Sequence, residues 1–146
     1  MSGKISKNGL KWIAALRSGK YKQTREALED KNGFCCLGVA CKLAEEEGVV
    51  ERFTNNLYIS YGKIREHYNF KEENSSYLPS FVMDWLCLRS PSGDLVQAPG
   101  ESLASMNDRG ASFEEIANTI EKFADVLFDQ NCVEEQEKEE QIGEQQ

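Results

Sequence analysis

The chain has 146 residues, of which 40% are hydrophobic, and a formal net charge of −8. This is enough for one domain core; no apolar run reaches the roughly 18 residues of a membrane span, and we expect no signal peptide after Met1. Residues 129–146 carry seven acidic residues and one lysine, so residues 1–128 have a net charge of only −2. We predict a folded domain over residues 1–128 and a disordered acidic tail over residues 129–146. Charge confined to a tail does not suit a protein that mimics DNA.

The N-terminal region predicts a helix followed by a short hairpin. Asn8 can cap a helix over residues 10–17, because its side chain can accept a hydrogen bond from an early backbone N–H. A short strand over residues 27–29 can then turn through Asn32-Gly33 and return at Phe34, because both turn residues tolerate positive φ.

The next segment predicts a buried central helix that starts at Cys36 or Leu37. Leu37, Ala40, Cys41 and Ala44 have the i, i+3, i+4, i+7 spacing of one helical face. Gly38 inside this helix costs about 1 kcal/mol relative to alanine. We therefore expect Gly38 at a place where another backbone approaches closely.

The second half of the chain predicts two further strands and two further helices. Residues 57–61 have strand composition, and a second strand would end near Phe70, followed by a polar loop over residues 71–76. Leu78-Pro79 opens one helix, and the capping box Ser112–Glu115 opens another that continues to Leu127. The predicted fold is α+β, with about four helices around one small antiparallel sheet formed by residues 25–36 and 56–70.

The predicted core combines the apolar faces of these helices with the hairpin. It comprises Trp12, Ile13, Leu16, Phe34, Leu37, Ala40, Cys41, Phe81, Trp85, Leu86, Phe113, Ile116, Ile120 and Phe123. The five cysteines are an odd number, and two of them are adjacent. This pattern favours free thiols in a reducing cytoplasm over a disulfide framework.

A basic stretch with one aromatic residue is the first candidate binding site. It comprises Arg17, Lys20, Tyr21, Lys22 and Arg25, and no acidic residue precedes Glu26. The cations could hold phosphate groups while the tyrosine ring stacks on a base. The alternative is an ordinary solvated basic surface.

Cys35 and Cys36 are the second candidate site. A thiol at a helix N-terminus can have a lowered pKa and act as a nucleophile, in an arrangement loosely similar to NlpC/P60-type peptidases. His67 is the only histidine and would have to act as the base. The alternative is that these cysteines are buried, inert thiols. A zinc site that adds Cys41 and Cys87 is disfavoured, because the spacing is not that of usual zinc ligands.

Met106-Asn107-Asp108-Arg109-Gly110 is the third candidate site, predicted as a polar turn. Asn107 and Asp108 could hydrogen-bond neighbouring backbone groups. Alternatively, they could line a pocket beside the N-terminus of the central helix, with Arg109 reaching an anion.

Several motifs resemble those of a group of small proteins from tailed phages and prophages. They are Tyr21-Lys22-Gln23, Gly33-Phe34-Cys35-Cys36-Leu37-Gly38-Val39, Leu78-Pro79, Met106-Asn107-Asp108 and Ser112-Phe113-Glu114-Glu115-Ile116-Ala117. The resemblance runs from about Trp12 to Ile120 and is weakest over residues 49–77. It implies an accessory phage protein of the kind that inhibits host enzymes or defence systems.

We therefore predict a non-enzymatic binding protein of the host cytoplasm that counters a host system. It would sequester a phosphate-bearing nucleotide-type ligand or cover a host protein. We expect no cofactor, no metal, no membrane partner and no duplex DNA partner, and homo-oligomerisation is left open. A cysteine hydrolase using Cys35 or Cys36 with His67 is the alternative.

Overall fold

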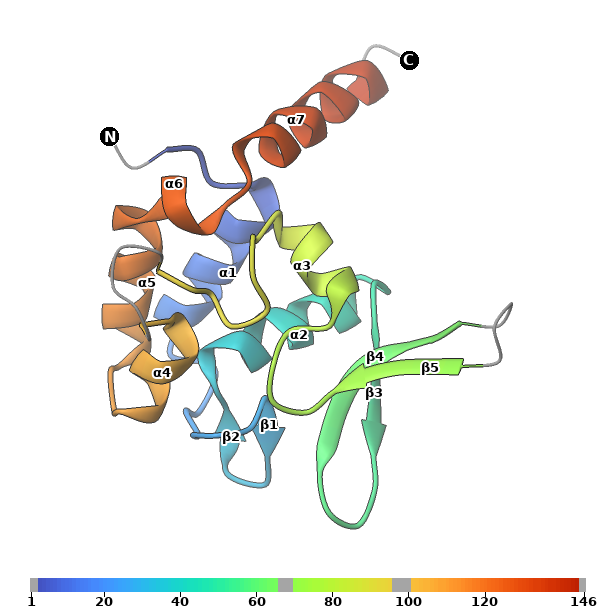
Figure 1. The fold of residues 1–146 in the computed structure, drawn as a ribbon, viewed down its shortest axis with the longest axis vertical. Helices are drawn as coiled ribbons and strands as arrows, with labels where there is room; N and C mark the ends of the chain where they lie inside the picture. The colour runs from blue at the N-terminus through green and yellow to red at the C-terminus, as the bar shows by residue number, and fades with distance from the viewer. Residues whose placement is uncertain (1–2, 66–69, 96–100, 145–146) are drawn as a thin grey trace.

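The computed structural model describes residues 3–65, 70–95 and 101–144 (Figure 1). The elements in chain order are α1 (Lys7–Arg17), β1 (Glu29–Asp30), β2 (Gly33–Phe34), α2 (Cys36–Glu46), β3 (Glu51–Thr54), β4 (Ile59–Arg65), β5 (Phe70–Asn74), α3 (Ser80–Leu86), α4 (Leu103–Asp108), α5 (Phe113–Lys122), α6 (Ala124–Leu127) and α7 (Gln130–Glu144). The predicted α+β class is confirmed. None of the described helices combines the length and the apolar character needed to cross a membrane.

The strands form two separate antiparallel sheets, where the sequence analysis predicted one. β1 pairs with β2, with Glu29 opposite Phe34, and β3, β4 and β5 form a second sheet in that order. The polar segment predicted as a loop supplies β5, whose Asn74 lies opposite Tyr61 of β4. The three-stranded sheet projects from the helical part of the molecule (Figure 1). Arg52 on β3 pairs with Glu29 on β1, which joins the two sheets.

Helix α2 lies at the centre of the core, as predicted. Its residues from Cys36 to Cys41 and its Ala44 are all buried. Trp12 of α1 is fully buried and donates its indole N–H to the Cys36 carbonyl over 2.9 Å. A Cβ on Gly38 would lie 1.7 Å from the Leu28 carbonyl oxygen. The predicted close backbone approach is therefore confirmed.

Most of the predicted core residues are buried, and four lie at its margin. Phe34, Phe81, Trp85 and Phe123 are partly buried residues that pack against the core. Phe123 is marginal because the helix predicted to run to Leu127 breaks there into α5 and α6.

Several helix and turn boundaries differ from the predictions. Ser6, not Asn8, caps α1 and accepts a hydrogen bond from the Gly9 N–H. The first hairpin turns through Lys31-Asn32, because the Asp30 carboxylate accepts the N–H groups of Asn32 and Gly33. The predicted polar turn over Met106–Gly110 starts within the short helix α4, which ends at Asp108; Arg109 and Gly110 form a turn, with a φ of 101° at Gly110.

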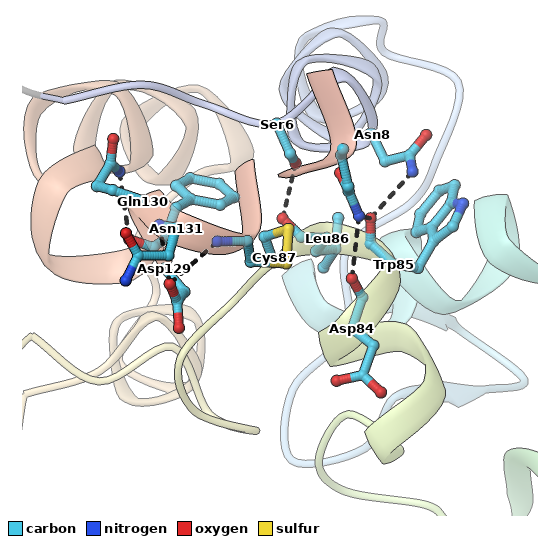
Figure 2. Close-up of a disulfide and its surroundings, with 12 residues drawn as sticks. Ser6, Asn8, Asp84, Trp85, Leu86, Cys87, Asp129, Gln130 and Asn131 are labelled. Atoms are coloured by element: carbon cyan, nitrogen blue, oxygen red, sulfur yellow. Dashed lines mark hydrogen bonds between the residues drawn. A yellow bond between two sulfur atoms is a disulfide. The ribbon is translucent and has the colours of Figure 1, made fainter. Parts of the chain in front are cut away.

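The acidic tail differs most from the sequence-based expectation. Residues 130–144 form α7, which extends away from the other helices (Figure 1). Its first turn is anchored by a disulfide between Cys87 and Cys132, whose Cα atoms are 5.6 Å apart (Figure 2). The prediction that all five cysteines are free thiols is therefore wrong for these two. Periodicity in the sequence did not reveal this pairing, because the partners are 45 residues apart.

Candidate binding surface between α2, α4 and the β3–β4 turn

A buried asparagine positions α4 against the start of α2. Asn107 is fully buried, and its side-chain N–H donates to the Thr24 carbonyl over 2.8 Å. Its side-chain oxygen accepts the Cys36 N–H over 3.1 Å and the Gln23 amide over 2.8 Å. Asn107 thus satisfies an otherwise unpaired N–H at the start of α2. Asn107 therefore bonds backbone groups, but these lie 71 and 83 residues away in the sequence and not among the neighbouring residues as the turn prediction assumed.

Asp108 holds the neighbouring loop in an unusual conformation. Its carboxylate accepts the Glu26 N–H over 2.8 Å. Glu26 has a φ of 66°, the left-handed region that non-glycine residues rarely adopt. Cys35 is the N-cap residue of α2, and its sulfur accepts the Gly38 N–H.

Glu26, Cys35 and Asp108 line a pocket of about 550 Å³ that lies beside α4 and next to the N-cap of α2. Its lining includes three carboxylates, four serine hydroxyls, one tyrosine and one cysteine, namely Glu26, Asp94, Asp108, Ser76, Ser92, Ser102, Ser105, Tyr77 and Cys35. Asp108 was predicted as a residue that could line a pocket beside the central helix, and it lines this pocket. Arg109 is not part of the lining. Carboxylates and hydroxyls accept hydrogen bonds from cationic groups, and carboxylates repel phosphate.

A groove adjoins this pocket. It has a volume of about 530 Å³ and lies between the β1–β2 hairpin and the turn that joins β3 to β4. Ala27 lines both the pocket and the groove, so the two hollows are neighbours that share this residue. We call the pocket and the groove together the two-hollow surface.

The rim of the groove displays two apolar side chains on an ordered turn. Leu57 is 90% exposed and Tyr58 is 47% exposed. The Asn55 side-chain oxygen accepts the N–H groups of both residues, each over 2.8 Å. A turn that is hydrogen-bonded in this way presents Leu57 to solvent at little further entropic cost on binding.

Two of the predicted phosphate-binding cations are already paired. Arg17 donates to Asn118 and Glu121, each over 2.6 Å, and thereby ties α1 to α5. The hydrogen bond that Arg17 donates to the Glu121 carboxylate raises the pKa of Arg17. Arg109 forms a two-pronged pair with Glu101, at 2.8 and 2.5 Å.

The rest of the basic stretch lies on the surface. Lys20, Lys22 and Arg25 are exposed. The Tyr21 ring packs edge-on against Phe34 with 5.5 Å between ring centroids, and the Lys20 ammonium lies 5.6 Å from the Tyr21 ring centre. Neither the pocket nor the groove is lined by Arg17, Lys20, Tyr21, Lys22 or Arg25. A phosphate-binding role for the exposed cations stays a prediction.

The three free cysteines are buried. Cys35 is 5% exposed, and Cys36 and Cys41 are fully buried. Burial raises the pKa of Cys35 to about 11 and the pKa of Cys36 and Cys41 well above the ordinary value. The thiolate needed for nucleophilic attack is therefore disfavoured. His67, the predicted base, lies outside the described residues. Cys87 cannot act as a zinc ligand while it is bonded to Cys132.

Sequence reasoning missed most of the pocket lining. Ser76 lies at the end of the segment predicted as a polar loop, and Ser92 and Asp94 follow the helix that Leu78-Pro79 opens. Serine-rich clusters at residues 75–76 and 90–92 were the available signal, but nothing local indicated that these loops converge on α4.

Comparison with known proteins gives a family and no function. The family model with the description "Domain of unknown function (DUF8296)" matches residues 1–124, which include α1 to α5 and every residue of the two-hollow surface. No curated protein and no solved structure matches the chain. Because the match covers well over half of the sequence, the chain belongs to the family described as Domain of unknown function (DUF8296).

Proposed function

We propose that this chain is a non-enzymatic binding protein that covers another protein with its two-hollow surface. The observation that supports this most is that the pocket and the groove share Ala27 in their linings. Together they are larger than one small ligand requires, and the exposed Leu57 stands on the rim. An exposed apolar anchor beside polar, hydrogen-bonding recesses is typical of a protein–protein interface.

The chemistry of the pocket indicates which part of a partner it would receive. Three carboxylates line it, and no lysine or arginine is among its described lining residues. A basic side chain of the partner would therefore be attracted, while a phosphate group would be repelled. We propose a lysine or arginine in the pocket and an apolar contact on Leu57.

The proposed partner is a host protein. This part of the proposal depends on the resemblance to small phage and prophage proteins, which implies an accessory protein that counters a host system in the host cytoplasm. The proposed role of the two-hollow surface does not depend on a phage origin, because the same surface could bind a partner protein from another source.

Capture from a host lysate tests the proposal when it compares matched variants. The immobilised chain should retain a partner that Leu57→Ser and Glu26→Lys each lose. Leu10→Ser is the control, because Leu10 is 54% exposed on α1 and lines neither hollow. Equal capture by all four proteins would contradict the proposed surface.

Nucleotide sequestration remains the other half of the original prediction. Isothermal titration against nucleotides and cyclic nucleotides tests it directly. The suitable variant is the triple change of Lys20, Lys22 and Arg25 to alanine, because Arg17 has a structural pairing with α5. If the wild-type chain binds a nucleotide and the triple variant does not, the basic stretch would become the proposed site in place of the two-hollow surface.

The cysteine hydrolase alternative has a separate test. Because Cys35, Cys36 and Cys41 are buried with raised pKa values, we expect iodoacetamide to label none of them rapidly between pH 5 and 9 in the native protein. Rapid labelling of Cys35 that His67→Ala abolishes would favour the hydrolase.

A further inference from the structure

The disulfide of α7 and the one buried side chain described in this helix both lie near its start. Cys132 is bonded to Cys87, Val133 is 1% exposed, and the Asp129 N–H donates to the Cys87 carbonyl over 2.7 Å. Figure 2 shows this junction between the segment that enters α7 and the C-terminal end of α3. These contacts therefore lie within residues 129–133, which are the first turn and the residue before it.

Beyond Val133 the described contacts of α7 are polar: the Gln136 amide donates to the Asp84 carbonyl over 3.3 Å and to the Trp85 carbonyl over 3.5 Å, and two ion pairs lie further along the helix. Glu137 pairs with Lys4 over 3.2 Å and Glu140 pairs with Lys7 over 2.8 Å, and all four side chains are about half exposed. Exposed pairs of this kind contribute little to stability. The helix also carries like charges four residues apart, such as Glu135 and Glu139, which oppose its formation. An isolated helix of this length is only marginally stable in water.

We propose that the Cys87–Cys132 disulfide is a redox-controlled latch on α7. When the disulfide is intact, α7 stays against α3, and Glu137 and Glu140 pair with Lys4 and Lys7. When the disulfide is reduced, α7 detaches from α3. The latch is independent of the proposed two-hollow surface, since no residue of α7 lines either hollow.

The latch needs a dithiol reductant. One thiolate of the reductant attacks the sulfur of Cys132, which is only partly buried, whereas Cys87 is 2% exposed. The S–S bond breaks, Cys87 leaves as a thiolate and takes up a proton, and a mixed disulfide forms on Cys132. The second thiol of the reductant then displaces Cys132. The net result is two protein thiols and one cyclic disulfide, with two electrons and two protons transferred to the protein.

The other cysteines are placed so that they do not interfere. Cys35, Cys36 and Cys41 are buried around α2. Their thiols are protonated at neutral pH because burial raises their pKa values. Exchange with the latch disulfide requires an accessible thiolate, so the latch should open and close without scrambling.

Hydrogen exchange on the full chain tests the latch. The oxidised protein and the protein reduced with dithiothreitol are compared at the same pH. We expect reduction to raise the exchange of residues 133–144 at least about tenfold while α2 keeps its protection. Trypsin cleavage after Lys138 should accelerate in parallel.

The Cys132→Ser variant is the matched control. It should exchange like reduced wild type, and dithiothreitol should not change it further. Three results would overturn the latch: unchanged protection of α7 after reduction, loss of protection in α2 together with α7, or five titratable thiols in the protein purified without reductant. The reduced wild type supplies the same comparison if the variant does not fold.

Discussion

The α2–α4 junction and the α3–α7 junction both join segments that are far apart in the sequence, and they do so by different means. At the first, the fully buried Asn107 side chain makes buried hydrogen bonds to the Thr24 carbonyl and the Cys36 N–H, and a partly buried one to the exposed Gln23 side chain. At the second, a disulfide, one buried valine and the Gln136 amide, which donates to the Asp84 and Trp85 carbonyls, hold a helix whose ion pairs are exposed. The first junction should therefore resist reductants and salt, whereas the second should respond to them.

The largest loss of stability is expected at Gly38 in α2, where the backbone of Leu28 packs directly against the helix. Gly38→Ala would place a Cβ 1.7 Å from the Leu28 carbonyl oxygen, so we expect the free energy of unfolding to fall by more than about 3 kcal/mol. Urea denaturation measures this. The control is Gly19→Ala, where no atom lies within 4 Å of the added Cβ and only the positive φ costs about 1 kcal/mol. Equal losses in the two variants would show that the close approach does not matter.

Removal of the buried amide should be the next largest effect. Asn107→Ala leaves the Cys36 N–H and the Thr24 carbonyl without their partner. We expect a loss of about 2–3 kcal/mol in urea denaturation, since each unsatisfied buried group costs roughly 1–3 kcal/mol. Asn118→Ala is the control, because Asn118 is exposed and accepts a hydrogen bond only at the surface of α5. A loss in Asn107→Ala no greater than in the control would contradict the role of this amide.

The ion pair that joins the two sheets should show a smaller, pH-dependent effect. Burial raises the pKa of Glu29, but hydrogen bonds from Arg52 and Tyr61 outweigh it, so the pKa lies below its ordinary value of 4.5. The charged carboxylate then stabilises the folded state above that pH, and this contribution is lost as the pH falls through the lowered pKa. We expect Arg52→Ala to cost about 1 kcal/mol at pH 7.

Denaturation at several pH values checks this prediction. The difference between wild type and Arg52→Ala should shrink as the pH falls below 4.5. A difference that stays constant from pH 7 to acid conditions would mean that Arg52 acts through packing of its side chain and not through the charge of Glu29.

The smallest loss of stability is expected for the exposed ion pairs between α7 and the N-terminal residues Lys4 and Lys7. The double change of Lys4 and Lys7 to alanine removes the pairs with Glu137 and Glu140. Because these side chains are about half exposed, we expect less than about 0.5 kcal/mol of global stability to be lost. Hydrogen exchange of α7 should change little while the disulfide is intact. A large loss of hydrogen-exchange protection of α7 in the oxidised double variant would mean that the ion pairs, and not the disulfide at Cys132, hold the helix in place.

Features that depend on interactions between near neighbours in the chain were predictable from the sequence. The i, i+3, i+4, i+7 spacing predicted α2, Ser112 predicted the start of α5, and the misfit of a glycine in a helix predicted the close approach at Gly38. Each of these signals lies within a few residues, because helical periodicity and capping act over one or two turns.

Tertiary structure alone decided the pocket, the pairing of the arginines and the disulfide. The Asn107 side chain contacts Cys36 across 71 residues, and Arg17 contacts Glu121 across 104. The sequence shows a basic stretch and an acidic tail, but it does not show which charges neutralise each other once the chain has folded. Such pairings follow from how the elements pack in three dimensions, and the local patterns that specify single elements carry no record of that packing.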